Sequence, residues 1–358
     1  MKFWKRGDTG LAAQAVQLRS REAHPFAQLR NFTPQRSGEL RLYQAVREAV
    51  PVVDAAVCKL IRLSGGVKVL CDDLETQTAL RTFLERVNAG RGQHGIEAFL
   101  SQYLDSLLVY GGAVGEMVPA AGNRTLAALL CGRLEQVELR EGESPLDFRI
   151  CGPDEHGSMA ELPYQELLLF TPLHPEAAHP YGVSMLRGIP FMADILMKIY
   201  HTIGVNWERC GNVRFAVTCR DGEGSAAQRG QVLAQEWSRA MQETRSGDVR
   251  DLVAVGDVDI RVIGADNQFI ATEVPVRQLL EQIVAKLGLP PFLLGLSWSS
   301  TERMSSQQAD LLTTEITALR RTLTPVLERI CRLWLRMHGF PCGFEVVWDE
   351  INLQDEVE

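Results

Sequence analysis

The stretch from Leu287 to Ser305 reads LGLPPFLLGLSWSSTERMS, and it separates the two clearest helical patterns in the second half of the chain. A helix that opens near Pro275 precedes it, since proline is favoured in the first turn of a helix. The stretch itself holds two prolines and two glycines. Proline lacks a backbone N–H and glycine costs backbone entropy, so both disfavour a helix interior. The sequence therefore predicts a loop between two helices.

The longest helical pattern follows this loop, from about Glu302 to His338. Its apolar residues recur every three or four positions, which is the spacing of one helix face. These residues are Leu312, Ile316, Leu319, Leu323, Leu327, Ile330 and Trp334. Pro325 lies inside the pattern and predicts a kink, because a proline removes one helical hydrogen bond. The chain then closes with a predicted strand, Phe344–Trp348, and an acidic tail.

Another face of this helix is basic. It carries Arg320, Arg321, Arg329, Arg332 and Arg336. Two interpretations of these arginines stay open. They either form a solvated face with a few weak salt bridges, or they bind an acidic surface of an adjacent subunit.

The first half of the chain alternates helices with short strands. Helices are predicted over 39–63, with a break at Pro51, over 74–87 and over 96–109. β-prone runs are predicted as strands at 67–70, 113–118, 134–139, 148–151 and 167–171. The last four runs are separated by Gly, Asn and Pro turns, which predicts a small mixed sheet.

A long helix is predicted next, from about 184 to 209. Ser184 is its expected N-cap, because a hydroxyl can accept a hydrogen bond from a free backbone N–H of the first turn. Gly188 and Pro190 predict a bend or a restart early in this helix. Residues 211–265 then form an α+β insert, with strands at 213–218, 252–255 and 260–263 and a polar helix at about 225–243.

The bulk composition excludes several classes of protein. The chain has 358 residues and a net charge of −8, which argues against a protein that grips nucleic acid through a basic surface. The same charge is compatible with a protein past which DNA slides. Residues 1–36 are polar, basic and aperiodic, and they are predicted to be a disordered or partner-bound arm. No membrane-spanning segment and no secretory signal are expected.

No catalytic or metal-binding pattern stands out. The eight cysteines form no CxxC pair, so we expect reduced thiols instead of a zinc site or a disulfide framework. There is no phosphate-binding GxxxxGK[ST] loop and no GxSxG motif. Asp72-Asp73 is interpreted as a turn or helix N-cap, and Gly111-Gly112 as a helix stop followed by a tight turn. We therefore expect a protein that is not an enzyme and binds no cofactor.

Four segments, in order along the chain, resemble the portal proteins of tailed bacteriophages. PYGVSML at Pro180–Leu186 is similar to the start of a long helix in that family. LGLPPFLLG at Leu287–Gly295 is similar to the family's loop between two helices. STERMS at Ser300–Ser305 continues that loop, and Phe344–Asp355 resembles the end of the portal wing. The resemblance covers roughly residues 40–355.

The resemblance implies an α+β portal fold with an α/β wing, a two-helix stem, a small α+β clip, a tunnel loop and a long kinked helix. The implied parts are the arm (1–36), the first part of the wing (37–182), stem helix 1 (183–210), the clip (211–265), stem helix 2 (266–287), the tunnel loop (288–305), and the long kinked helix with the wing's closing strand (306–358). Portal proteins usually continue into a helical crown, which is absent or truncated in this sequence.

The function implied by the resemblance is structural. About twelve copies would form a ring at the capsid vertex of a virion, made in the cytoplasm of a bacterial host. The ring would pass double-stranded DNA during packaging and ejection. The implied partners are the terminase large subunit, a head-tail adaptor, and the major capsid and scaffold proteins, with no membrane.

Site residues follow from the same resemblance. The candidates for contact with DNA in the channel are Trp298, Ser299, Ser300, Thr301 and Arg303. Arg320, Arg321, Arg329, Arg332 and Arg336 are the candidates for the subunit interface. The apolar members of the loop have an alternative role, packing against the neighbouring loop. The alternative function is a capsid adaptor or scaffold-binding protein that forms no DNA channel.

Overall fold

A computed structural model describes residues 36–142, 147–154, 157–177, 179, 181–211, 214–219, 235, 238, 258–263, 271–296 and 302–351. Residues 1–35 of the predicted arm lie outside this part of the chain. Contacts divide the chain into two compact units. The first unit combines Met1–Ala193 with Glu281–Glu358, and the second is Asp194–Leu280.

The first unit opens with two helices, α2 (Arg36–Ala49) and α3 (Pro51–Leu63), divided where the sequence predicted a break. Val50 between them has an extended backbone, with φ −116° and ψ 97°. Pro51 then occupies the first turn of α3, where its missing N–H leaves no helical hydrogen bond unmade. Val46 of α2 and Val53 of α3 are buried, whereas Leu42 of α2 is exposed.

The next two helices, α4 (Leu74–Arg86) and α5 (Ile96–Tyr110), also match the sequence prediction. The Asp73 carboxylate caps α4, since it accepts hydrogen bonds from the backbone N–H of Thr76 at 2.8 Å and from its hydroxyl at 2.7 Å. These hydrogen bonds lower the pKa of Asp73. Tyr103 on α5 is fully buried, and its hydroxyl donates to the Ala113 carbonyl at 3.1 Å. Helix α5 is therefore tied directly to the sheet beneath it.

Helix α5 packs against a five-stranded sheet, and a separate three-stranded sheet lies in the same unit. The five-stranded sheet has the order β3-β2-β5-β4-β9. Its strands are β2 (Asn88–Gly90), β3 (Gln93–His94), β4 (Gly112–Pro119), β5 (Leu126–Gly132) and β9 (Leu168–Pro172). The three-stranded sheet has the order β6-β7-β8. Its strands are β6 (Glu138–Glu141), β7 (Phe148–Pro153) and β8 (Met159–Glu161).

Two sequence predictions need correction in this region. The predicted strand 134–139 begins as a short 3-10 helix, η2 (Leu134–Gln136), and the strand starts at Glu138. Strand β5, at the centre of the larger sheet, was not predicted. Its sequence LAALLCG lacks β-branched residues, which carry most of the strand signal. Its place in the sheet comes from pairing with β4 and packing against α5.

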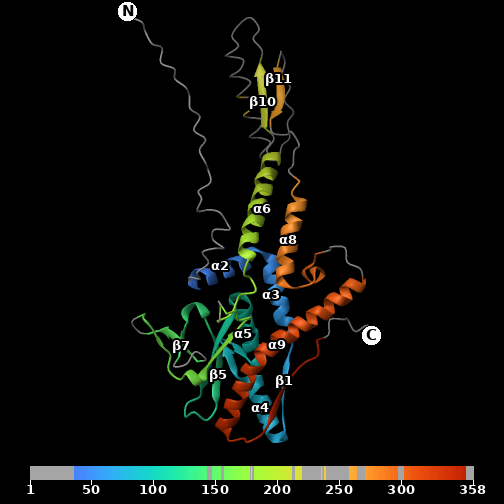
Figure 1. Ribbon diagram of the computed structural model, residues 1–358. Helices are drawn as coiled ribbons and strands as arrows, with labels where there is room; N and C mark the ends of the chain where they lie inside the picture. Colours follow the sequence, from blue (N-terminus) through green and yellow to red (C-terminus); the bar gives the residue numbers. More distant parts are fainter. Residues whose placement is uncertain are drawn as a thin grey trace, which may run out of the picture. The chain divides into compact units, whose positions relative to one another are not determined.

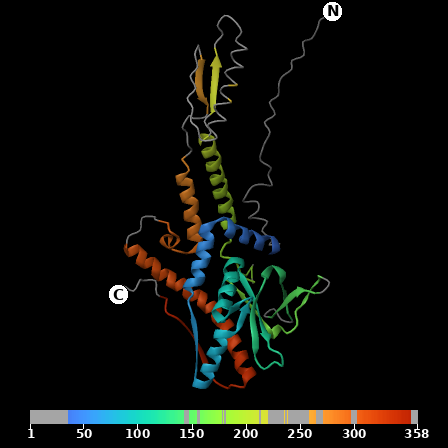
Figure 2. The same cartoon turned by 180° about the vertical axis from the view of Figure 1, so that it is seen from behind.

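The first unit also contains a two-stranded sheet that joins an early strand to the last described strand of the chain. Strand β1 (Val67–Cys71) pairs antiparallel with β12 (Phe344–Trp348). Helix α9 (Glu302–His338) leads into β12 and contacts α4, β9 and β12. Both views show α9 changing direction along its length, as the proline inside it predicted (Figures 1 and 2). Trp334 near its end stacks on Phe83 of α4, with ring centroids 5.3 Å apart.

A crossing segment at residues 181–188 covers the C-terminal end of α5. The Met185 N–H donates to the Leu108 carbonyl at 3.1 Å, and the Ser184 hydroxyl donates to the Val109 carbonyl at 2.6 Å. The Ser184 oxygen also accepts a hydrogen bond from the Leu186 N–H at 2.9 Å. The carbonyls at a helix C-terminus have no partner within the helix. The PYGVSML segment supplies partners for two of them.

This arrangement corrects the predicted role of Ser184. The residue does not cap the helix that follows it, because α6 (Ile189–Gly211) begins five positions later. Gly188, with φ +91°, lies directly before the helix and marks the predicted restart. Ser184 instead ties the start of this connection to the end of α5.

The second unit contains most of α6, most of α8 (Glu273–Leu287), and two strands between them. These strands, β10 (Arg214–Cys219) and β11 (Val258–Ile263), lie near the predicted strands 213–218 and 260–263, and they pair antiparallel. The portions of α6 and α8 in this unit lie side by side in both views (Figures 1 and 2). The predicted strand 252–255 and the predicted helix 225–243 lie outside the described residues, except for residues 235 and 238, which are helical.

The crossing segment generates a stability prediction with a matched control. Gly182 has φ +97°, and an added Cβ would lie 2.0 Å from the Gly111 carbonyl oxygen. Gly122 has a similar φ of +86°, with nothing within 4 Å of an added Cβ. We expect Gly122→Ala to destabilise the protein by about 1 kcal/mol, and Gly182→Ala by about 3 kcal/mol or more, because the second adds a clash with backbone.

Urea unfolding of both variants beside the unchanged chain measures this difference. Equal losses of stability in the two variants would contradict the close approach of Gly182 to the end of α5.

Candidate functional site

The base of the predicted tunnel loop is a packed structure. Leu287 and Leu289 are buried at 4% and 3% exposure, on either side of a turn at Gly288, where φ is +68°. The 3-10 helix η4 (Pro291–Leu294) follows and contacts α3. It ends at Gly295 in the left-handed region, and the Leu296 N–H donates to the Pro291 carbonyl at 3.1 Å. The prolines and glycines that predicted a loop thus build a compact turn against α3.

The predicted channel residues lie beyond this base. Trp298, Ser299, Ser300 and Thr301 fall outside the described residues, and their contact with DNA stays a prediction. Arg303 lies in the first turn of α9, which begins at Glu302 as the apolar spacing indicated. The last four residues of the segment assigned to the loop, 302–305, are therefore helical.

One candidate for the subunit interface, Arg320, is buried within the subunit. It is only 7% exposed, so it does not present its charge to an adjacent subunit. Its Nε donates to the Ser64 carbonyl at 2.8 Å and its Nη1 to the Asp349 carbonyl at 2.7 Å. The guanidinium carbon lies 5.5 Å from the centroid of the Trp348 ring, in cation–π range. Burial lowers the pKa of Arg320.

These contacts make Arg320 the junction of three elements. Ser64 ends α3, Asp349 follows β12, and Arg320 itself lies on α9. A third hydrogen bond supports the same junction, because the Trp348 indole N–H donates to the Thr324 hydroxyl at 3.1 Å. The sequence showed a basic stripe but could not show that Arg320, one of its residues, is buried.

The other four arginines of the basic stripe, Arg321, Arg329, Arg332 and Arg336, are exposed, as a surface role requires. Arg329 donates to the Glu166 carbonyl at 3.0 Å, and Arg332 lies 3.8 Å from Glu328 in an exposed pair. Such a pair contributes at most about 1 kcal/mol, so Arg332 remains available to a partner. The two interpretations of the stripe, a solvated face and a subunit contact, stay open for these four residues.

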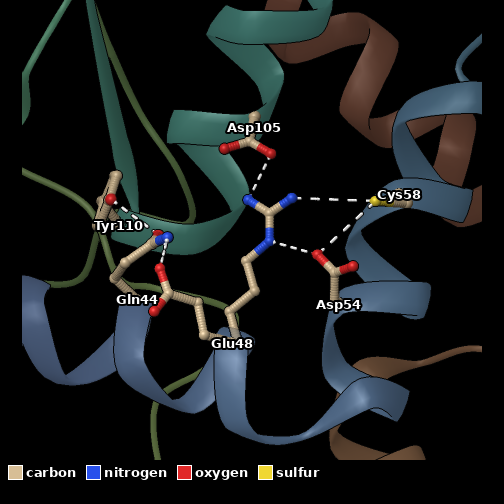
Figure 3. Close-up of polar contacts among 7 residues, drawn as sticks. Gln44, Glu48, Asp54, Cys58, Asp105 and Tyr110 are labelled. Atoms are coloured by element: carbon tan, nitrogen blue, oxygen red, sulfur yellow. Dashed lines mark hydrogen bonds and ion pairs between the residues drawn. The ribbon is translucent and has the colours of Figure 1, made fainter.

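Arg47 organises the helices against which the loop base packs. It lies on α2, and its Nε is 2.8 Å from Asp54 of α3 while its Nη1 is 2.6 Å from Asp105 of α5. Figure 3 shows the acidic partners and Cys58 converging from two helices on this position. Burial alone would lower the pKa of Arg47, but the hydrogen bonds to both carboxylates outweigh burial and raise it. Helix α3, against which η4 packs, is thereby fixed to α2 and α5.

A pocket of about 920 Å³ opens beside this cluster. Asp105, Tyr110, Gln44, Arg133 and Glu135 are among the residues that line it. Within the described residues, no three His, Cys, Asp or Glu side chains come together in a group that could hold a metal ion. No helix in the described part of the chain is long and apolar enough to cross a membrane.

Solved structures with a similar fold come from gene transfer agent (GTA) particles. A chain from the neck of an empty GTA particle, computed with C6 symmetry, aligns with a TM-score of 0.62 at 18% identity, over 92% of this chain and 90% of the other. A chain from the virion of the native GTA particle gives the same TM-score and identity, over 88% and 84%. This protein has the fold of a GTA neck chain.

The structure, which combines helices with sheets, confirms the α+β class predicted from the sequence. A neck chain of the native particle, computed with C12 symmetry, aligns at a TM-score of 0.59 and 16% identity, over 85% of this chain and 83% of the other. No protein-family model matches the chain. No curated protein matches it either.

The Arg320 junction generates a second prediction. Arg320→Lys leaves one cation but cannot reach both carbonyls in the same geometry, so at least one buried acceptor loses its partner. We expect a loss of about 2–4 kcal/mol of unfolding free energy, because a buried charge is left with incomplete hydrogen bonding. The neighbouring exposed residue supplies the control, and Arg321→Lys should change stability by less than about 0.5 kcal/mol.

Urea unfolding followed by tryptophan fluorescence measures both variants. An Arg320→Lys variant as stable as Arg321→Lys would show that the junction contributes little to the fold.

Proposed function

We propose that this chain is the subunit of a portal ring at a capsid vertex, forming the channel through which double-stranded DNA is packaged and ejected. The observation that carries the proposal is the likeness of fold, over nine-tenths of the chain, to a chain from the neck of a GTA particle. The order of the four sequence segments that resemble portal proteins supports it independently. The role is structural, and the energy for moving DNA comes from a separate motor.

A closed ring accounts for the symmetry of the related particles. The neck structures that share this fold were computed with C12 and with C6 symmetry. A cyclic ring needs two complementary surfaces on each subunit, since each copy contacts the next one head to tail. The exposed arginines of α9 are our candidates for one of these surfaces. The α6–β10–β11–α8 unit corresponds to the stem and clip, where the terminase motor and the head-tail adaptor would dock.

The loop after η4 is the proposed channel element. Its base, the 3-10 helix η4, contacts α3. Hydroxyl side chains and a tryptophan, with no acidic or basic residue among the five residues from Ser297 to Thr301, suit weak and sequence-independent contact with a moving duplex. The net charge of −8 agrees with sliding, because each strong phosphate contact would hold the DNA in place.

Native mass spectrometry and negative-stain images of the full chain test the ring. At 39.8 kDa per subunit, we expect about 480 kDa for a ring of about twelve copies, with a central hole wide enough for duplex DNA. A chain that stays monomeric even with the scaffold and capsid proteins of its own particle would contradict the proposal. Assembly into a capsid without a central hole would favour the adaptor alternative.

A charge reversal tests the proposed subunit surface. In the triple variant Arg321→Glu, Arg332→Glu and Arg336→Glu, repulsion from an acidic neighbour should weaken each subunit interface at least tenfold, by about 1.4 kcal/mol or more, and so lower the yield of rings. The control reverses three exposed arginines on other helices, with Arg41→Glu, Arg81→Glu and Arg86→Glu. Equal ring yields in the two triple variants would assign the α9 arginines to a solvated face.

Binding to free DNA tests the sliding model. We expect the isolated chain to bind a short duplex with a Kd weaker than about 10⁻⁴ M at physiological salt, because proteins that grip DNA do so through a basic surface. Fluorescence anisotropy with a labelled duplex measures this. A submicromolar Kd that weakens steeply with added salt would contradict a channel built for weak contact.

A further inference from the structure

Four exposed arginines line one face of the second half of α9. At 3.6 residues per turn, they fall within roughly a quarter-turn of one another and extend along about 22 Å of the helix axis. We call this set the arginine stripe, and it consists of Arg321, Arg329, Arg332 and Arg336. Between the first and the last of these residues, α9 has one acidic residue, Glu328. The stripe therefore has an excess of positive charge.

Contacts among the described residues neutralise little of this charge. Glu328 lies 3.8 Å from Arg332, in a pair whose side chains are 45% and 59% exposed. Arg329 donates to two backbone carbonyls, which carry no full negative charge. Arg321 and Arg336 have no carboxylate of a described residue within ion-pair distance. The stripe is therefore open to an acidic partner.

An acidic segment of the same chain starts close to this stripe. The Asp349 carbonyl accepts a hydrogen bond from Arg320, the residue directly before Arg321. The described residues stop at Ile351, and the sequence continues as NLQDEVE over residues 352–358. We call these residues the acidic segment, because they include no basic side chain and have carboxylates at Asp355, Glu356 and Glu358.

The acidic segment is long enough to reach the stripe. It has to pass from the Arg320 side of α9 to the exposed face, and a helix with its side chains is about 10–12 Å wide. An extended chain covers about 3.4 Å per residue, so the step from Asp349 to Asp355 spans up to about 20 Å. The first carboxylate of the segment can therefore reach Arg321.

The last carboxylate can reach further along the stripe. Arg332 lies about 17 Å from Arg321 along the helix axis. The step from Asp349 to Glu358 spans up to about 31 Å in an extended chain, which is enough to reach Arg332. Exposed ion pairs are individually weak. Tethering raises the effective concentration of the segment to about the millimolar range, so contacts too weak to bind a free peptide can hold it.

We propose that the acidic segment binds the arginine stripe of its own chain. Asp355 and Glu356 pair with Arg321. Glu358 pairs with Arg332. The segment then occupies arginines that the proposed function assigns to an adjacent subunit, so it competes with ring formation. This competition rests on the proposed function, whereas the contact within one chain does not.

Carbodiimide cross-linking of the full chain tests this contact, because the reagent joins a carboxylate to a lysine amine only where the two groups touch. Arg321→Lys and Arg332→Lys each keep the positive charge and place an amine in the stripe. We expect both variants to form links to residues 352–358, located by fragment ions in mass spectrometry. Lys68 and Asp349, 2.9 Å apart, should link in every variant and report that the chain is folded.

The matched control is Arg41→Lys, which places an amine at an exposed arginine of α2. Its links to the acidic segment should be at least tenfold less abundant than those of Arg321→Lys. A mixture of chains with and without isotope labels shows whether each link lies within one chain or between two. We expect links within one chain.

Three outcomes would overturn the proposal. The first is no link from either stripe variant to the acidic segment while the Lys68–Asp349 link forms. The second is equal linking by Arg41→Lys, which would show contact without specificity. The third is linking only between labelled and unlabelled chains, which would assign the stripe to the segment of an adjacent copy.

A second measurement leaves the arginines unchanged. The charge of the segment is removed in a triple variant, Asp355→Asn, Glu356→Gln and Glu358→Gln. Arg321 and Arg332 should then react with phenylglyoxal, a reagent for arginine, at least threefold faster than in the unchanged chain. Three exposed carboxylates elsewhere are removed in the matched control, Glu75→Gln, Glu116→Gln and Glu135→Gln. Equal reaction rates in the two triple variants would contradict the contact. Both measurements use the isolated chain, so their failure leaves the portal proposal untouched.

Discussion

The first unit depends on one buried cation. Arg320 donates to backbone carbonyls at the end of α3 and just after β12, and it lies against the Trp348 ring. Backbone carbonyls offer a guanidinium hydrogen bonds without a full opposite charge, so the group is satisfied while buried. The contacts join residues 64, 320 and 349, which no local interaction could bring together. The C-terminal strand, the long helix and the N-terminal helices become one body through this side chain.

A second layer of contacts connects this body to the loop. Arg47 holds α2, α3 and α5 together, and η4 packs on α3. The crossing segment then ties the entry of α6 to the end of α5 through Ser184 and Met185. The loop base and the start of α6 are therefore both held by the same group of helices in the first unit.

The sequence predicted what local spacing determines. The helices around Pro51, the long helix through Pro325 and the cap at Asp73 all follow from periodicity and from residues with one favoured position. Strand β5 was not predicted, because its alanines and leucines have little strand preference and its position depends on pairing with β4. Ser184 was misassigned for a related reason: its hydrogen-bond partner lies 75 positions away in the sequence. Arg320 looked like its exposed neighbours because burial is set by the tertiary fold.

Helix α9 has a mechanical consequence. Its 37 residues span roughly 55 Å at 1.5 Å per residue, from the end of the loop segment to the approach of β12. An α-helix resists compression along its axis, so a load on its first turn travels to its far end. Pro325 is the place where one backbone hydrogen bond is missing, and bending strain concentrates there. The helix is therefore stiff along its axis except at Pro325, which lies five residues after Arg320.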